Sequence, residues 1–258
     1  MKIVLVGPAH PFKGGIMHYT TILFQKLKVA HDVRYYAFSR QYPRWLFPGK
    51  IDGRSDTLFS LNGEVHRVLD SFKPWTWIQT ARAICSYSPQ ILILPWWVLF
   101  WAPLLHTLVR ETKKNPRTRI VFICHNVMPH ERSLFAKPLA RSVLGLADEL
   151  IVHCEQDKRL LASILPHVRV HKIMHPSYDV FRKNVNRDQA RAKLGWASGQ
   201  LQGDGVVPEQ RLSRTSGYPS CDFGSWIRRY LWPRVQDPKS PKGCEVETGA
   251  VKELRHPL

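Results

Sequence analysis

"MKIVLVGPAHPFKGGI", residues 1–16, is the stretch that decides the fold. Four consecutive apolar residues follow Lys2, and a loop with two prolines then leads to Gly14 and Gly15. A short apolar run of this kind is typical of a buried parallel strand, and glycine lets the backbone approach other groups closely. We therefore predict a first strand over Lys2–Gly7 and a helix over Gly15–Lys28. The run is too short for the hydrophobic part of a signal peptide.

Short apolar runs and longer helical patterns alternate along most of the chain. The runs lack a strict apolar–polar alternation, as expected for parallel strands covered on both faces. Strand–helix–strand repetition predicts an α/β fold, a doubly wound and mainly parallel Rossmann-like sheet with helices on both faces and an irregular C-terminal tail. Further strands are expected at Asp32–Phe38, Gln90–Leu94, Arg119–Cys124, Glu149–His153 and Arg169–Met174, and further helices at Trp75–Ser86, Phe100–Lys113, Ser133–Gly145 and Asp157–Leu165.

The chain is strongly basic, with 38 Lys and Arg against 20 Asp and Glu and a net charge of +18 over 258 residues. Residues 1–196 hold 29 basic and 13 acidic residues, so most of the excess belongs to the part with regular patterns. Such a charge favours anionic partners, which are nucleic acid, an acidic membrane surface or phosphorylated substrates. We predict no nucleic-acid binding, because the chain has no helix-turn-helix, zinc-finger or aromatic RNA-binding signature.

The five cysteines are widely spaced, odd in number and free of any CxxC pattern. This usage predicts reduced, buried thiols in a cytoplasmic protein, with neither a disulfide framework nor a zinc site.

The segment "ILILPWWVLFWAPLLHTLV", residues 91–109, is nearly long and apolar enough to span a membrane. Its two prolines and an internal histidine favour a buried strand, then a break at Pro95–Trp97, then a helix. Tryptophan settles at membrane interfaces, so Trp96, Trp97 and Trp101 predict an aromatic patch on the surface. The basic run at 110–119 is either a solvated loop or a contact for anionic head groups.

The Gly14–Gly15 loop is a candidate phosphate site. Free N–H groups and the positive end of the dipole at a helix N-terminus suit a phosphate, and Lys13 adds positive charge. The alternative is a tight strand-to-helix turn without a ligand.

The loop "CHNVMPHE", residues 124–131, follows the predicted strand Arg119–Cys124 and carries His125, Asn126, His130 and Glu131. Imidazole can transfer protons near neutral pH, and a carboxylate can act as a base or orient a hydroxyl. These residues lack a recognisable metal-ligand spacing, so we predict no metal site. The alternative is local capping of the loop. Polar residues clustered after a parallel strand favour a functional site.

Two more strands end in polar residues. His153 and Glu155 follow one of them, where a structural role at a helix start is the stronger alternative. His175 leaves the last predicted strand, where a linker role and a ligand contact are equally good explanations.

Four stretches in order resemble the N-terminal, acceptor-side domain of family-four retaining glycosyltransferases, which have two facing Rossmann-like domains, the GT-B architecture. They are "MKIVLVGPAHPFKGGI", "VFICHNVMPHE", "ADELIVHCEQDKRLL" and "HKIMHPSYDVF", and "LPWWVLFWAP" also resembles a segment of that domain. The resemblance covers about residues 1–196. It implies transfer of a hexosyl group from a UDP- or GDP-sugar to a glycan or lipid-linked acceptor, as in polysaccharide biosynthesis, with retention and without a required cofactor or metal.

The resemblance also assigns roles to residues. It implies that Gly14 and Gly15, with Lys13 beside them, lie at the donor diphosphate, and that His125 lies near the transferred sugar. We predict His125 and Glu131 as catalytic residues. The expected substrate-binding residues are Asn126, His130, His153, Glu155 and His175.

The chain departs from the family after residue 196. We predict a domain over 1–182, a linker and helix start over 183–196, and an irregular or disordered tail over 197–258 in place of a donor domain. Some sixty residues are too few for a second Rossmann-like domain. A truncated or frame-shifted product with little activity alone is therefore expected. The alternative is a non-catalytic module that binds an anionic membrane, as a peripheral protein at its inner face, or a partner protein.

Overall fold

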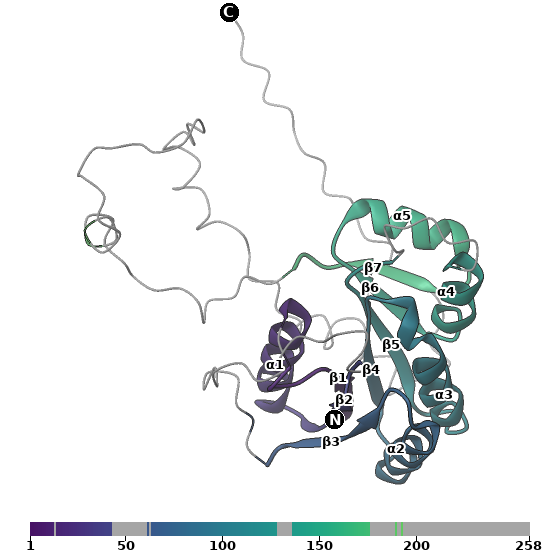
Figure 1. Ribbon diagram of the computed structural model, residues 1–258. Helices are drawn as coiled ribbons and strands as arrows, with labels where there is room; N and C mark the ends of the chain where they lie inside the picture. Colours follow the sequence, from purple (N-terminus) through teal and green to yellow (C-terminus); the bar gives the residue numbers. More distant parts are fainter. Residues whose placement is uncertain are drawn as a thin grey trace, which may run out of the picture.

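The computed structural model describes residues 1–12, 14–42, 61, 63–127 and 136–175, together with 189 and 192. Within them, a single sheet of seven strands has the order β3-β2-β1-β4-β5-β6-β7. Every neighbouring pair is parallel (Figure 1). The strands are β1 Lys2–Gly7, β2 Asp32–Arg40, β3 Val65–Asp70, β4 Ile91–Trp96, β5 Arg119–Cys124, β6 Glu149–Val152 and β7 Arg169–Lys172. The predicted doubly wound α/β fold is confirmed.

Helices cover both faces of this sheet. Helix α1, Gly15–Lys28, packs Leu23 and Phe24 on one face, against Ile3 and Leu5 of β1. The opposite face is covered by α2 Pro74–Tyr87, by α3 Ala102–Thr112 behind the short 3-10 helix η2 Leu99–Trp101, by α4 Ala136–Leu144 and by α5 Glu155–Ile164 (Figure 1).

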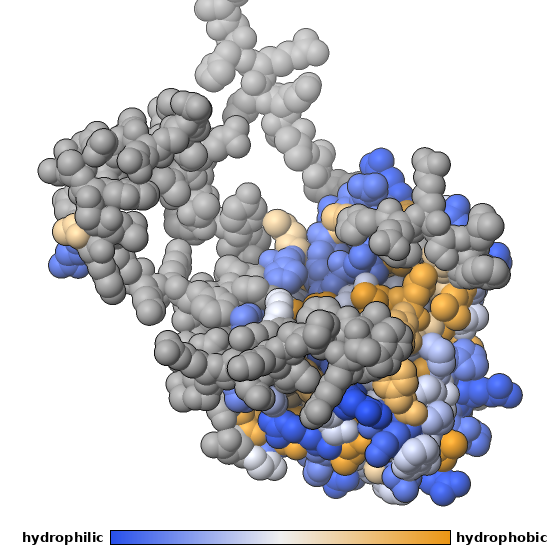
Figure 2. Space-filling view, viewed as in Figure 1, coloured by the Kyte–Doolittle hydropathy of each residue, from blue (hydrophilic) through white to orange (hydrophobic). Residues whose placement is uncertain are grey.

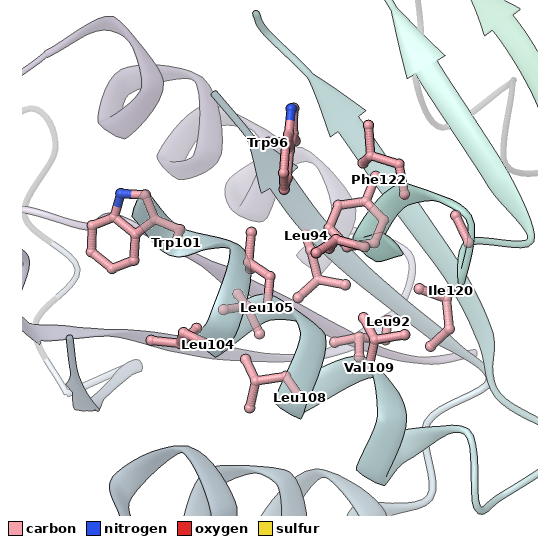
Figure 3. Packing of buried hydrophobic residues seen from close by; sticks show 14 of the residues in the cluster. Leu92, Leu94, Trp96, Trp101, Leu104, Leu105, Leu108, Val109, Ile120 and Phe122 are labelled. Carbon is pink, nitrogen blue, oxygen red and sulfur yellow. The ribbon is translucent and has the colours of Figure 1, made fainter. Parts of the chain in front are cut away.

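Strand residues divide between the two faces by their parity. In β1, Ile3 and Leu5 belong to the core under α1, whereas Val4 and Val6 belong to the larger core on the other face. Successive side chains of a strand point to opposite faces, so a strand buried on both faces needs an unbroken apolar run. Figure 3 shows the larger core, where Leu105 and Val109 of α3 lie beside Leu94 and Leu92 of β4.

The predicted bounds of β1, β5 and α1 are confirmed to the residue, and the other predicted elements differ by a few residues at their ends. One strand was missed. Within the described residues, edge strand β3 pairs with β2 alone, and His66 and Arg67 interrupt its apolar residues with exposed polar ones. A partly solvated edge strand therefore lacks the continuous apolar run that marks the central strands.

The predicted break at Pro95–Trp97 is wrong for Pro95 and Trp96. The predicted surface patch is wrong for two of its three tryptophans. Strand β4 continues through Pro95 to Trp96. Pro95 lies past the last pair that β4 forms with β1, Leu5–Ile93, so β1 does not need its missing N–H. Trp96 and Trp101 are each only 1% exposed and belong to the larger core.

Trp97 is half-buried and packs against Trp101 at 5.4 Å between ring centroids. Among the described residues, no helix is long and apolar enough to cross a membrane.

The prediction of buried cysteines holds in part. Cys85, Cys124 and Cys154 are free thiols, and of these three only Cys124 is buried, whereas Cys154 is exposed at the N-terminus of α5. Cys221 and Cys244 lie outside the described residues. The sequence stretches predicted as a linker and an irregular tail, 183–196 and 197–258, lie outside the described residues apart from Gln189 and Ala192.

Candidate functional site

The strand order places the candidate site at one edge of the sheet. The chain winds outward in one direction through β2 and β3 and in the other through β4 to β7, so the order reverses between β1 and β4. Ligands of doubly wound sheets bind beyond the carboxyl ends of the strands at this point. The loops after β1, β4, β5 and β6 meet there.

Gly14 and Gly15 stand at the start of α1 on this edge. Gly14 has φ 126° and ψ 162°, a conformation that L side chains rarely adopt, and it offers no side-chain cap to the helix. A Cβ added at either glycine would meet no atom within 4 Å. Packing inside the chain therefore does not require a glycine at 15, which leaves room for a ligand against the backbone. Lys13 lies outside the described residues.

Gly7 is a glycine whose role the sequence did not reveal. A Cβ there would lie 3.0 Å from Cγ2 of Thr20, so β1 and α1 approach each other closely and a side chain would require Thr20 to shift by a few tenths of an ångström. Thr20 Oγ1 donates to the Pro8 carbonyl at 2.7 Å, and the Tyr35 hydroxyl donates to the same oxygen at 2.5 Å. Burial raises the pKa of Tyr35, so its hydroxyl stays a donor. These contacts fix the beginning of the loop that precedes Gly14.

Three predicted histidines come together around one tyrosine. The β5–β6 register pairs Ile123 with Ile151, and two residues later His125 and His153 lie side by side with ring centroids 5.2 Å apart. The ring of Tyr19 on α1 is 4.6 Å from that of His125 and 5.6 Å from that of His153. His175 lies 5.2 Å from Tyr19 and 5.1 Å from His153.

The structure thus brings the three predicted histidines together, while their binding and catalytic roles stay predictions. Tyr19 was missed, because an aromatic residue within an amphipathic helix has the pattern of an ordinary core residue. We call His125, His153, His175 and Tyr19 the histidine cluster.

Hydrogen bonds fix two members of the histidine cluster. The main-chain N–H of His125 donates to the main-chain carbonyl of Trp96 at 2.8 Å, which continues the β4–β5 hydrogen-bond ladder past the end of both strands. His153 Nδ1 lies 2.9 Å from the Ile173 carbonyl. Because a carbonyl only accepts, the neutral ring of His153 holds its proton on Nδ1 and presents a lone pair on Nε2. In the described part of the chain, the buried Nε2 atoms of His125 and His153 have no hydrogen-bond partner.

Burial keeps both imidazoles neutral. It lowers the pKa of His125 to about 3, with the neighbouring His153 and His175 as smaller causes. Burial also lowers the pKa of His153, although its bond to the Ile173 carbonyl acts in the opposite direction. Neutral imidazoles with unpartnered nitrogens are suited to hydrogen bonds with hydroxyl groups rather than to ion pairing. No group of three or more His, Cys, Asp or Glu side chains within the described ranges is arranged to hold a metal ion.

The remaining predicted residues divide into three groups. Asn126 is half-buried directly after His125, at the same edge. Glu155 instead pairs with Lys172 of β7 at 3.0 Å, and this bond lowers the pKa of its carboxyl group, which supports the structural alternative for Glu155. His130 and Glu131 lie outside the described residues, so their predicted roles stay predictions.

Comparisons with known proteins give structural neighbours only. No family model and no curated protein matches the chain. It is similar to an alpha-glucosyltransferase in complex with UDP, with 15% identity and a TM-score of 0.44 over 69% of this chain and 44% of that one. It is also similar to the UDP-N-acetylglucosamine 2-epimerase from Rickettsia bellii, with 10% identity and a TM-score of 0.46 over 67% and 44%.

A third similar structure is a sucrose-phosphate synthase fragment from Thermosynechococcus elongatus, with 12% identity and a TM-score of 0.40 over 76% of this chain and 96% of that one. The neighbours thus include a UDP-bound glycosyltransferase and a UDP-sugar epimerase. The chain spans less than half of the length of these two. At TM-scores below 0.5 the likeness carries no argument about activity, which has to come from the residues of this chain.

Proposed function

We propose that the chain is the acceptor-side domain of a GT-B-type, family-four retaining glycosyltransferase. The observation that carries the proposal is the histidine cluster, in which His125 and His153 present buried, neutral and unpartnered nitrogens at the carboxyl edge of the sheet. This is the edge at which doubly wound sheets bind their ligands. A sugar, with many neutral hydroxyl groups, matches such nitrogens better than an ionic ligand does.

The proposed donor is a UDP- or GDP-sugar. Its diphosphate would lie against Gly14 and Gly15, where the start of α1 has no acidic residue and a Cβ would point into open space. The transferred sugar would lie at His125, with Asn126 beside it. The sequence resemblance supports further roles for Lys13 and His130 in binding and for Glu131 in catalysis. We propose no metal requirement, because backbone amides and basic side chains can hold the phosphates.

The acceptor of the whole enzyme is proposed to be a glycan or a lipid-linked saccharide, at the cytoplasmic face of a membrane. The resemblance implies a second domain that supplies most of the nucleotide pocket. Without such a domain, residues 1–175 would hold half of the donor site, which predicts weak donor binding and little turnover.

The experiment is a binding measurement on the purified full chain, by calorimetry or ligand-observed NMR, with UDP, GDP and UDP-glucose. Two variants test the site. Gly15→Val places a side chain where the diphosphate would lie, and His125→Ala removes the sugar contact. Each should weaken binding roughly tenfold, the size of one or two lost hydrogen bonds. His106→Ala on α3 is the matched control, since His106 is a half-buried histidine outside the cluster. Absence of binding by a folded chain, or equal binding by all variants, would refute the half-site.

A further inference from the structure

The loop between β3 and α2 and the first turns of α2 expose large apolar side chains, although the loop is held by several hydrogen bonds. Trp75 is 56% exposed, Phe72 42% and Ile78 41%. Phe100 of η2 is 42% exposed and lies 5.7 Å from Phe72 between ring centroids. Scattered single apolar residues are ordinary on a protein surface, but a contiguous group of this size marks an interaction site.

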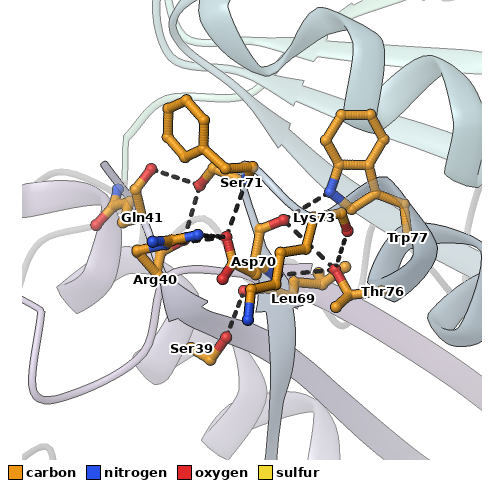
Figure 4. A network of polar contacts seen from close by, with 10 residues as sticks. Ser39, Arg40, Gln41, Leu69, Asp70, Ser71, Lys73, Thr76 and Trp77 are labelled. Carbon is orange, nitrogen blue, oxygen red and sulfur yellow. Dashed lines mark hydrogen bonds and ion pairs between the residues drawn. The ribbon is translucent and has the colours of Figure 1, made fainter. Parts of the chain in front are cut away.

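Several hydrogen bonds hold the β3–α2 loop in one conformation (Figure 4). The Asp70 carboxylate accepts from Arg40 Nη2 at 2.8 Å and from the Phe72 N–H at 2.9 Å. Trp77 Nε1 donates to the Asp70 carbonyl at 2.7 Å, and Ser71 Oγ donates to the Arg40 carbonyl at 2.7 Å. Phe72 and Trp75 are therefore exposed in a segment whose conformation is held by hydrogen bonds.

Basic side chains lie beside two of these apolar side chains, and one of them, Arg40, is also paired with Asp70. The Arg40 guanidinium lies 5.5 Å from the Phe72 ring, and the Lys73 ammonium lies 5.6 Å from the Trp75 ring. On α2, Trp75, Ile78 and Arg82 are spaced i, i+3 and i+7 and form one exposed stripe. No residue of α2 is acidic.

We infer that this aromatic–basic surface, made of Phe72, Lys73, Trp75, Ile78 and Phe100 with Arg40 and Arg82, docks the chain on a bilayer that contains anionic lipids. Aromatic side chains settle at the level of the head groups, and each Lys or Arg near an anionic surface adds attraction. The net charge of +18 provides long-range attraction of the same sign. A protein partner could also bind the apolar residues, but an anionic bilayer accounts for the neighbouring basic residues as well.

The position of the surface suits the candidate site. Phe72 and Phe100 follow β3 and β4, and the histidine cluster follows β5, β6 and β7, so all lie toward the carboxyl edge of one parallel sheet. The space-filling view shows that apolar areas open to solvent alternate with hydrophilic ones on the face that it displays (Figure 2). Docking through the aromatic–basic surface would bring this edge close to a lipid-linked acceptor. In this respect alone the inference rests on the proposed function.

The test is co-sedimentation of the full chain with vesicles of phosphatidylcholine, with and without phosphatidylglycerol, at low and high salt. We expect binding only to the anionic vesicles and weaker binding at high salt. The double variant Trp75→Ser/Ile78→Ser should weaken binding by roughly tenfold or more, because the loss of apolar burial weakens interfacial binding. Lys73→Glu should also weaken it. The control is Val29→Ser, because Val29 is 86% exposed just after α1, at the opposite edge of the sheet.

The results separate two proposals. Folded chain that ignores anionic vesicles, or that binds them equally well as wild type and as the Trp75→Ser/Ile78→Ser variant, overturns the docking surface. Nucleotide binding by these same surface variants should stay unchanged, and vesicle binding should survive His125→Ala. The docking surface and the half-site can therefore fail independently of each other.

Discussion

The rings of His125 and His153 lie side by side, 5.2 Å apart, with both Nε2 atoms buried and without a partner among the described residues. The β5–β6 register fixes this relationship, because Ile123 pairs with Ile151 and the two histidines follow at equal spacing. Two adjacent imidazoles cannot both be charged at low cost in such a place. The fold therefore keeps them neutral, and a pH below neutrality should oppose folding.

The pH dependence of stability should show this effect. An imidazole with a lowered pKa in the folded state contributes stability that is fully present above its ordinary pKa of 6.5 and is lost as the pH falls toward about 3. We expect the free energy of unfolding, measured in urea, to decrease between pH 7 and pH 5 more steeply for wild type than for His125→Phe. One such group contributes at most about 1.4 kcal/mol per pH unit. Identical slopes for the two proteins would contradict a neutral, buried His125, and data near pH 8 provide the reference.

The two glycines at the start of α1 should respond oppositely to alanine. Gly15 has no positive φ and open space around its Cβ position, so Gly15→Ala should stabilise the fold by about 0.4–1 kcal/mol through the unfolded state. Gly14 has φ 126°, so Gly14→Ala should destabilise the fold by about 1–3 kcal/mol. Urea unfolding of the two variants beside wild type measures both signs. Equal effects would mean that the backbone at Gly14 is not held as described.

Much of the fold could be predicted because burial on both faces leaves a visible pattern. The central strands are continuous apolar runs, and the bounds of β1 and β5 follow from them. Edge strand β3 could not be predicted, because half of its residues are exposed to solvent and do not form an apolar run. The burial of Trp96 and Trp101 was also hidden, because the same side chains suit a membrane interface and a protein core. Only tertiary contacts decide between them, such as those of Trp101 with Phe38 and of Trp96 with Phe122.

The candidate site could be predicted in part. The rule that ligands bind beyond the carboxyl ends of parallel strands favoured a functional site after Cys124, and the structure adds His153 and His175 beside His125. Their contact depends on the register between β5 and β6, which cannot be read from the sequence. Tyr19 comes from a helix that precedes the nearest of these histidines by about a hundred residues, and Glu155 found a partner in Lys172 on a neighbouring strand. Contacts between distant segments of this kind are set by tertiary structure alone.

The Asp70 network should be costly to remove. Asp70 is 7% exposed and its carboxylate accepts from Arg40 and from the Phe72 N–H. Asp70→Ala should lower the free energy of unfolding by about 1–3 kcal/mol, because two partly exposed donors lose a charged acceptor. Glu64→Ala, which breaks the exposed pair with Lys28, is the control and should cost less than about 1 kcal/mol. Similar costs for both would mean that the Asp70 contacts do not hold the loop.

Trp101 and Trp75 have opposite places in the fold. Trp101 is 1% exposed and packs on Phe38 at 4.1 Å between ring centroids, whereas Trp75 is 56% exposed on α2. Trp101→Ala should lower the free energy of unfolding by about 3–5 kcal/mol, since it leaves a cavity in the core. Trp75→Ala should change it by no more than about 0.5 kcal/mol. Urea unfolding of both variants decides the matter, and a large loss of stability for Trp75→Ala would show that this side chain serves the core and not the aromatic–basic surface.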